Sequence, residues 1–98
     1  MKHLLHPEAE AEFLDAVRHY SGISLELGHR FYDEVSGLLR AACAHPLRHR
    51  VIDPPIRRVL ADGFPYAVLY AVKADCVLIV AVMPLKRQPG YWKHRLTN

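Results

Sequence analysis

Apolar side chains recur at helical spacing along the first half of the chain. Between residues 7 and 20 the stripe consists of Ala9, Phe13, Ala16, Val17 and Tyr20. Spacings of three and four residues bring such side chains onto one face of an α-helix, here about four turns long. Pro7 suits the first helical position, and we expect Ser21-Gly22 to break the helix.

A second helical pattern starts after Ser24, a residue type that suits a helix N-cap. Its apolar stripe consists of Gly28, Phe31, Tyr32, Val35, Leu38, Leu39 and Ala42. Pro46 is expected to end this helix, because proline lacks the N–H that a helix interior needs. Since the link between the two helices is short and contains glycine, we expect an antiparallel helix hairpin.

Four further segments have the patterns of β-strands, at residues 2–5, 56–61, 64–72 and 76–83. Asp62-Gly63 lies between two of them and predicts a two-residue type I′ turn, which would pair Ala61 with Phe64 and Arg58 with Ala67. Residues 46–55 are expected to be irregular, because the prolines in this stretch prevent regular hydrogen bonding.

The strand over residues 64–72 has one bulky face and one smaller face, since side chains alternate across a sheet. The bulky face carries Phe64, Tyr66, Val68, Tyr70 and Val72 and is expected to pack on the helices. The smaller face carries Pro65, Ala67, Leu69 and Ala71, together with Ile56, Arg58 and Leu60 of the neighbouring strand. Residues 76–83 do not alternate, which predicts a central strand buried on both sides. We therefore expect a partner to cover the smaller face if this chain does not.

Length and composition bound the class of protein. A chain of 98 residues, about half of them apolar, suits one domain over residues 1–98 with a modest core. The longest apolar run, 76–83, is far shorter than the ~20 residues that a membrane helix needs. The apolar stretch at the N-terminus is too short for a signal peptide. These features predict a cytoplasmic protein without membrane contact.

Charge is distributed unevenly along the chain. Residues 1–46 have a balance of −3, whereas residues 47–98 have a balance of +6. A basic second half favours a positive face that binds nucleic acid or an acidic protein segment, although a solvated basic surface explains charge alone equally well.

A set of short motifs occurs in a characteristic order. They are Pro7-Glu8-Ala9-Glu10, Tyr20, Leu27-Gly28-His29-Arg30-Phe31, Pro46, Arg57-Arg58, Phe64-Pro65-Tyr66, Tyr70, Ile79-Val80-Ala81-Val82, Arg87, Pro89, Tyr91-Trp92 and Arg95. In this order and spacing the chain resembles the RelE/ParE superfamily, the toxins of bacterial type II toxin–antitoxin pairs, sometimes labelled plasmid stabilisation proteins. The resemblance implies an α+β fold of order β-α-α-β-β-β, with the helix hairpin on one face of a mainly antiparallel sheet and an antitoxin segment over the other.

Two departures from the family pattern bear on mechanism. Ribonuclease members often have an arginine where this chain has Ala67, and many relatives have a histidine where it has Pro84. Both changes remove groups suited to charge stabilisation or proton transfer. The resemblance therefore favours a ParE-like poison of DNA gyrase over a RelE-like, metal-independent endoribonuclease that cleaves mRNA on the ribosome. A third alternative is a degenerate member that only binds its antitoxin.

The expected partner-binding residues are those of the smaller face and the basic tail, namely Ile56, Arg58, Leu60, Leu69, Lys86, Arg87, Tyr91 and Arg95. If the chain is a ribonuclease, the catalytic candidates are Arg58, Lys86, Arg87 and Tyr91. Trp92 is expected to be structural. No metal or cofactor is expected, because His45 and His49 are separated by the helix-ending Pro46 and no other zinc-ligand spacing occurs. The expected assembly is either a homodimer or a toxin–antitoxin hetero-oligomer.

Overall fold

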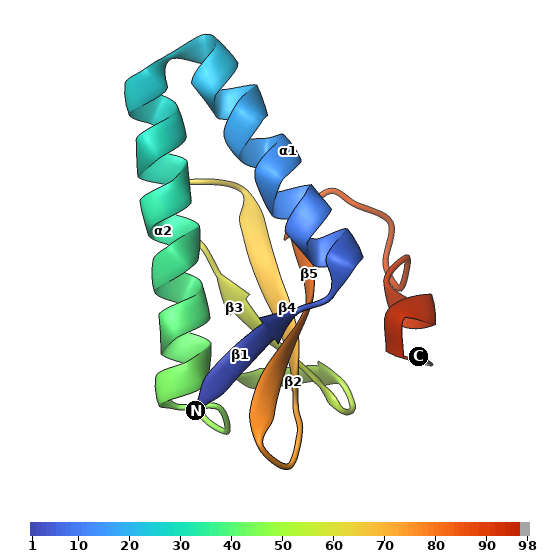
Figure 1. Ribbon diagram of the computed structural model, residues 1–98. Coiled ribbons are helices and arrows are strands. Elements are labelled where there is room, and N and C mark those ends of the chain that lie inside the picture. Colours follow the sequence, from blue (N-terminus) through green and yellow to red (C-terminus); the bar gives the residue numbers. More distant parts are fainter. Residues whose placement is uncertain (97–98) are drawn as a thin grey trace.

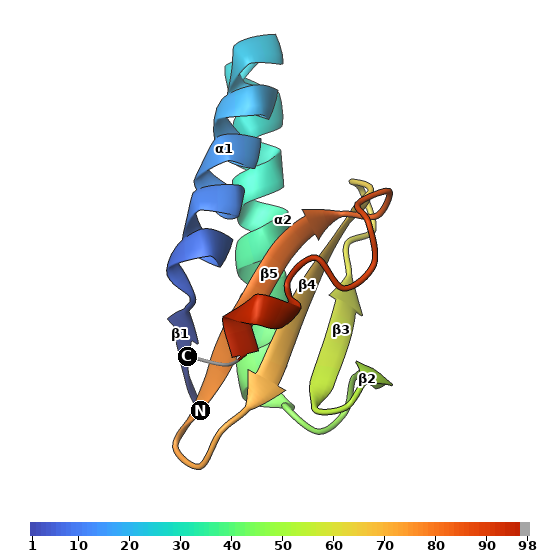
Figure 2. The ribbon, with the colours of Figure 1, turned by 90° about the vertical axis from the view of Figure 1, so that its right-hand side faces the viewer.

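The computed structural model describes residues 1–96 and has two layers, a helix pair and a five-stranded sheet (Figure 1). The strand order is β1-β5-β4-β3-β2. The helices cover one face of the sheet, and the C-terminal segment lies across the β5 side of the molecule (Figure 2). The predicted α+β class is confirmed.

The helix hairpin forms as the apolar stripes predict. Helix α1 spans Pro7–Ile23 and α2 spans Leu25–Ala44. The Ser24 hydroxyl accepts a hydrogen bond from the Leu27 N–H at 3.0 Å, which confirms Ser24 as the N-cap of α2. The predicted break at Ser21-Gly22 is wrong by one turn, since α1 continues to Ile23 and Ser24 alone joins the helices.

The sheet contains one strand that the sequence did not predict. Strand β1 (Lys2–Leu5) pairs in parallel with β5 (Cys76–Pro84), and β3 (Ile56–Leu60) and β4 (Tyr66–Val72) continue the sheet. An additional strand, β2 (Arg50–Asp53), pairs antiparallel with β3 inside the segment expected to be irregular. The prolines at 54 and 55 form the turn between these strands rather than preventing pairing, and β2 lies at the sheet edge.

The predicted register between β3 and β4 is wrong by two residues. Leu60 pairs with Ala67 and Arg58 with Leu69, so residues 61–65 form a loop longer than a two-residue turn. The Gly63 N–H donates to the Glu34 carboxylate of α2 at 2.8 Å, a contact that holds the loop against the helix layer. Because the shift is an even number of residues, every side chain keeps its predicted face.

Buried side chains form one cluster on each face of the sheet. The cluster between sheet and helices includes Phe13, Phe31, Val35, Phe64, Val68 and Tyr70. The cluster on the opposite face consists of Ile56, Leu69, Ala71, Val80, Ala81 and Trp92. The β4–β5 pairing skips Val80, which places it beside Ala81 in this second cluster. The predicted division of β4 into two faces is confirmed, as is the structural role of Trp92.

Among residues 1–96, no helix is both long enough and apolar enough to cross a membrane.

Candidate functional site

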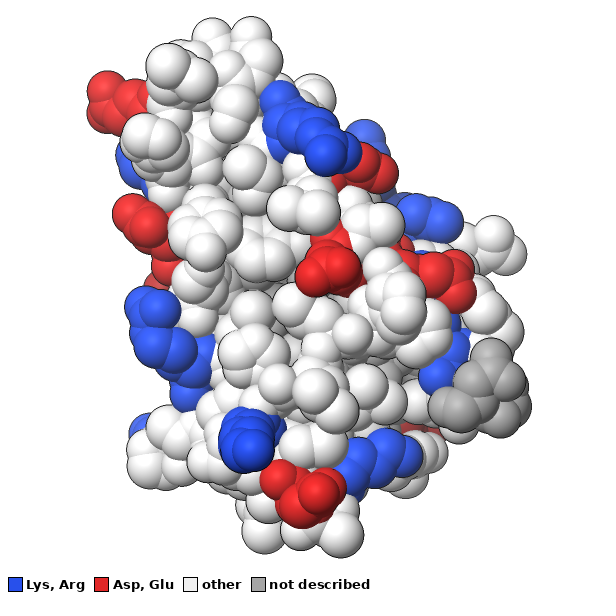
Figure 3. All heavy atoms as spheres, viewed as in Figure 1, with Lys and Arg blue, Asp and Glu red and all other residues white. Residues whose placement is uncertain are grey.

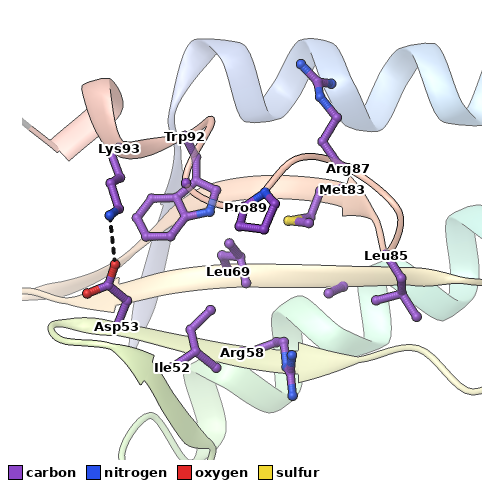
Figure 4. A pocket seen from close by; sticks show the side chains of 12 residues that line it. Ile52, Asp53, Arg58, Leu69, Met83, Leu85, Arg87, Pro89, Trp92 and Lys93 are labelled. Carbon is purple, nitrogen blue, oxygen red and sulfur yellow. Dashed lines mark ion pairs between the residues drawn. The ribbon is translucent and has the colours of Figure 1, made fainter.

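A groove of about 410 Å³ lies on the sheet face opposite the helices (Figure 4). Ala67 and Leu69 of β4 and Met83 of β5 form its floor. Ile52, Asp53 and Arg58 of the β2–β3 hairpin line one wall, and the C-terminal segment lines the other with Arg87, Pro89, Gly90, Trp92 and Lys93. The groove is therefore a gap between two elements that each cover part of the second face.

An ion pair crosses one end of this groove. The Lys93 ammonium lies 3.4 Å from the Asp53 carboxylate, linking the C-terminal segment to β2. Both side chains are largely exposed, so the pair contributes under ~1 kcal/mol to stability. Within residues 1–96, Asp53 is the one carboxylate that lines the groove, and this ion pair occupies it.

The structure brings part of the predicted site together. Arg58 and Leu69 line the groove, and Leu60 lies at the end of β3 with 49% of its surface exposed. Leu85, which was not predicted, lines the groove and is 50% exposed. Ile56 is fully buried in the second cluster, so it supports the groove from within and cannot touch a partner directly. Lys86 is exposed beside the groove and is not among the residues that line it.

Arg58 and Arg87 belong to opposite walls, and their guanidinium groups point away from each other (Figure 4). The Arg87 guanidinium carbon lies 4.0 Å from the centre of the Tyr91 ring, a cation–π contact. Arg87 also borders a second hollow of about 240 Å³ beside α1, lined by Asp15, His19 and Tyr66 among others. The two arginines thus flank the groove without converging on one point inside it.

Arg95 was predicted on the basic rim, but it is buried, with 4% of its surface exposed. Its two terminal nitrogens each lie 2.9 Å from an oxygen of the Glu12 carboxylate, and one also donates to the Val80 carbonyl at 2.9 Å. Beyond the end of β1, no strand among residues 1–96 borders this edge of β5. Glu12 and Arg95 instead supply hydrogen-bond partners to the Val82 N–H and the Val80 carbonyl. Arg95 is therefore a structural residue of the free chain.

Tyr91 belongs to the same cluster. Its hydroxyl donates to the Glu12 carboxylate at 2.5 Å. Burial, the hydrogen bond to Glu12 and the negative charge of Glu12 raise the pKa of Tyr91 well above its ordinary value. Its phenol therefore keeps its proton near neutral pH and is committed to Glu12, which makes it a poor proton-transfer group.

Glu12 is the residue of this region that sequence reasoning missed. Its oxygens accept from Arg95, from Tyr91 and, at 3.0 Å, from the Val82 N–H. A signal was available, because Glu12 lies three residues after Ala9 and four before Ala16, both of which are buried. A carboxylate at the border of an apolar stripe is placed to reach the layer below.

Charge on the helix side gives no comparable site. In the view of Figure 3, Lys and Arg are interspersed with Asp and Glu, and neither sign dominates. Within residues 1–96 no three His, Cys, Asp or Glu side chains are grouped so that they could hold a metal ion.

Comparison with known proteins gives evidence at the level of the fold. No model of a protein family matches the sequence, and no curated protein matches it. A solved structure described as the chromosomal ParDE TA system from P. aeruginosa does match, with a TM-score of 0.74 over 86% of this chain and 95% of that one, at 17% sequence identity. The chain shares its fold with a ParDE protein. The fold expected from the RelE/ParE resemblance is thereby confirmed.

In this ParDE-like fold, the two departures from the family pattern take definite places. Ala67 is buried on the groove floor opposite Met83, so an apolar surface stands where ribonuclease members often carry a cation. Pro84 ends β5 opposite Tyr66 and borders the smaller hollow rather than the groove. The groove can therefore hold apolar side chains and anions, and no histidine or tyrosine lines it in the part of the chain that the structure describes.

Proposed function

We propose that this chain is the toxin of a type II toxin–antitoxin pair and that a segment of its antitoxin lies in the groove. The observation that carries the proposal is the fold shared with the ParDE system over most of both chains. The position of the groove supports it, since the groove lies on the one sheet face that the helices leave uncovered.

The surface around the groove supports a protein partner. Leu60 and Leu85 are about half exposed, and Ile52, at 37%, adds further apolar surface at the wall. A small protein seldom leaves contiguous apolar surface uncovered unless it binds something there. The half-buried Arg58 and the exposed Arg87, one at each wall, favour a segment that carries acidic residues.

For the mode of toxicity we propose a ParE-like poison of DNA gyrase. Cleavage of mRNA needs a group that takes the 2′-hydroxyl proton and cations that converge on the developing charge. Here Tyr91 is bound to Glu12, Asp53 is paired with Lys93, and the heads of Arg58 and Arg87 diverge. This arrangement supports binding rather than phosphodiester chemistry.

Expression in a bacterial host tests the proposal. The chain alone is expected to arrest growth, and co-expression of the product of the adjacent gene is expected to restore growth and to yield a stable complex. Unimpaired growth together with no binding of the neighbouring product would contradict the proposal. Harmless expression with retained binding would instead indicate the degenerate alternative. In that case the double variant Pro84→His, Ala67→Arg would test whether restoring the relatives' residues makes the chain toxic.

The nucleic acids of arrested cells distinguish the two modes. We expect cleaved DNA and an induced SOS response with intact mRNA. Codon-linked cuts in mRNA without DNA damage would contradict the gyrase assignment and establish the ribonuclease instead.

A further inference from the structure

Two arginines face each other across the β2–β3 hairpin. Arg50 pairs directly with Arg58 in the observed register, and directly opposed residues of an antiparallel pair share a face, with Cβ atoms about 4.5–5.5 Å apart. Since Arg58 lines the groove, Arg50 continues the same face next to it. The sequence alone did not reveal this pair, because Arg50 lies in the segment expected to be irregular.

Neither member of the pair has an acidic partner in the chain. Within residues 1–96 no carboxylate lies at ion-pair distance from Arg50 or Arg58, and neither side chain makes a hydrogen bond. The neighbouring Arg57 differs, because its guanidinium donates to the carbonyls of Leu47 and His49 at 3.1 and 2.8 Å. Asp53, the carboxylate on the same strand as Arg50, is bound by Lys93.

Like charges placed directly opposite each other destabilise a sheet. A guanidinium pair with this spacing is also suited to a carboxylate, which it can bind through several charge-assisted hydrogen bonds. An anion from outside would therefore offset the repulsion that two directly opposed cations bring to this strand pair.

We propose that Arg50 and Arg58 clamp an acidic side chain of an extended partner segment whose apolar side chains enter the groove. The inference rests on the proposed function for the identity of the partner, and it assigns that partner's chemistry. The groove floor beside the pair is formed by Leu69, Ala67 and Met83, and Leu60 is exposed at the same edge. A peptide with alternating apolar and acidic residues complements both surfaces.

A nucleic acid fits these surfaces less well. Single strands are held by bases stacked on exposed aromatic rings next to a basic track. Trp92, the aromatic residue of the groove, is 4% exposed and belongs to the second core cluster. The phosphates would meet the arginines, but nothing in the strand would cover the apolar floor.

Titration of the free chain followed by NMR tests the proposal without any neighbouring gene product. The probes are a capped Leu-Glu-Leu-Glu-Leu peptide, its Leu-Gln-Leu-Gln-Leu counterpart and a short single-stranded oligonucleotide. The acidic peptide should shift the amide signals of Arg50 and Arg58 saturably. Arg50→Gln and Arg58→Gln should each weaken binding about tenfold, equivalent to about 1.4 kcal/mol. The double variant should weaken binding by less than the product of these two fold-changes, because both residues bind the same carboxylate. Arg40→Gln on the exposed side of α2 is the matched control and should bind as the parent does.

Thermal unfolding of the same variants supplies a second readout. At low salt Arg50→Gln should raise the melting temperature of the free chain slightly, because it relieves the repulsion, whereas loss of a structural residue would lower it. Several results would overturn the proposal: equal binding of the glutamine peptide, binding of the oligonucleotide in place of the peptide, or no binding of any probe. Shifts of the same signals with chain concentration alone would assign the pair to a second copy and would also overturn it. The peptides are synthetic, so this titration does not depend on the growth assay. Either test can fail while the other succeeds.

Discussion

Arg58 and Arg87 reach the groove from its two walls, and both are free of acidic partners within the described residues. Replacing either by alanine is expected to weaken growth inhibition strongly. The free energy of unfolding should change by less than ~1 kcal/mol, because Arg58 makes no hydrogen bond and Arg87 loses one cation–π contact. Growth curves and urea titrations of each variant measure the two effects.

Arg30→Ala is the control, since Arg30 is exposed on the helix layer far from the groove. If the Arg30 variant lost toxicity while both groove variants kept it, the active surface would lie on the helix side of the sheet. That result would contradict the assignment to the groove.

Glu12 of α1 accepts hydrogen bonds from Tyr91, Val82 and Arg95 at the edge of β5. Glu12→Ala leaves the buried Arg95 with only the Glu8 carboxylate, at 3.8 Å, as its counter-ion and removes the acceptor of Tyr91, so the free energy of unfolding should fall by about 3 kcal/mol. Glu10→Ala, two residues earlier on α1 and exposed, should change it by less than about 0.5 kcal/mol. Urea unfolding decides, and equal stability of both variants would show that the buried pair does not hold the C-terminal segment.

Residue positions were predictable from the sequence where they follow from the alternation of side chains along a strand. They were missed where they depend on a partner far away in the chain. The sheet face of Leu69 and the structural role of Trp92 were predicted correctly, because apolar character and strand parity are local properties. Arg95 was expected at the surface, because a charged residue is seldom buried unless paired, and its partner Glu12 lies 83 positions away in the chain.

At the scale of elements, the helix hairpin depends on a close approach at Gly28. A Cβ added there would lie 2.0 Å from the Ser21 hydroxyl oxygen and 2.9 Å from the Ser21 Cα atom of α1. Gly28→Ala should therefore force the helices apart and lower the free energy of unfolding by about 1–3 kcal/mol. Thermal or urea unfolding measures the change.

Gly37 on the same helix is the matched control, because a Cβ there would meet only the end of the Arg40 side chain at 3.7 Å. Gly37→Ala should stabilise the chain by about 0.4–1 kcal/mol, since alanine restricts the unfolded chain and favours the helix. If both substitutions stabilise the chain, the two helices can accommodate a Cβ at residue 28, which would contradict the predicted clash with Ser21.

The sequence predicted both helices, four of the five strands and the two faces of β4, because periodicity and capping are local signals. It did not predict β2 or the β3–β4 register. The register depends on the loop at 61–65, whose Gly63 N–H is held by Glu34 of α2, and β2 forms only because β3 offers it an edge. These are tertiary effects that override local turn and proline signals.

At the scale of the whole molecule, the chain covers its sheet unequally. Two helices bury one face, while the C-terminal segment and the β2–β3 hairpin cover the other only in part and leave the groove between them. The incomplete cover of this face leads to the central proposal, that a partner segment completes it.

Hydrogen–deuterium exchange of the chain, alone and with the product of the adjacent gene, tests this claim most directly. The account predicts slower exchange in β2, β3 and the segment 85–93 around the groove on complex formation, with exchange in the exposed turns of α1 and α2 unchanged. Protection confined to the helix hairpin, or no protection anywhere, would contradict it.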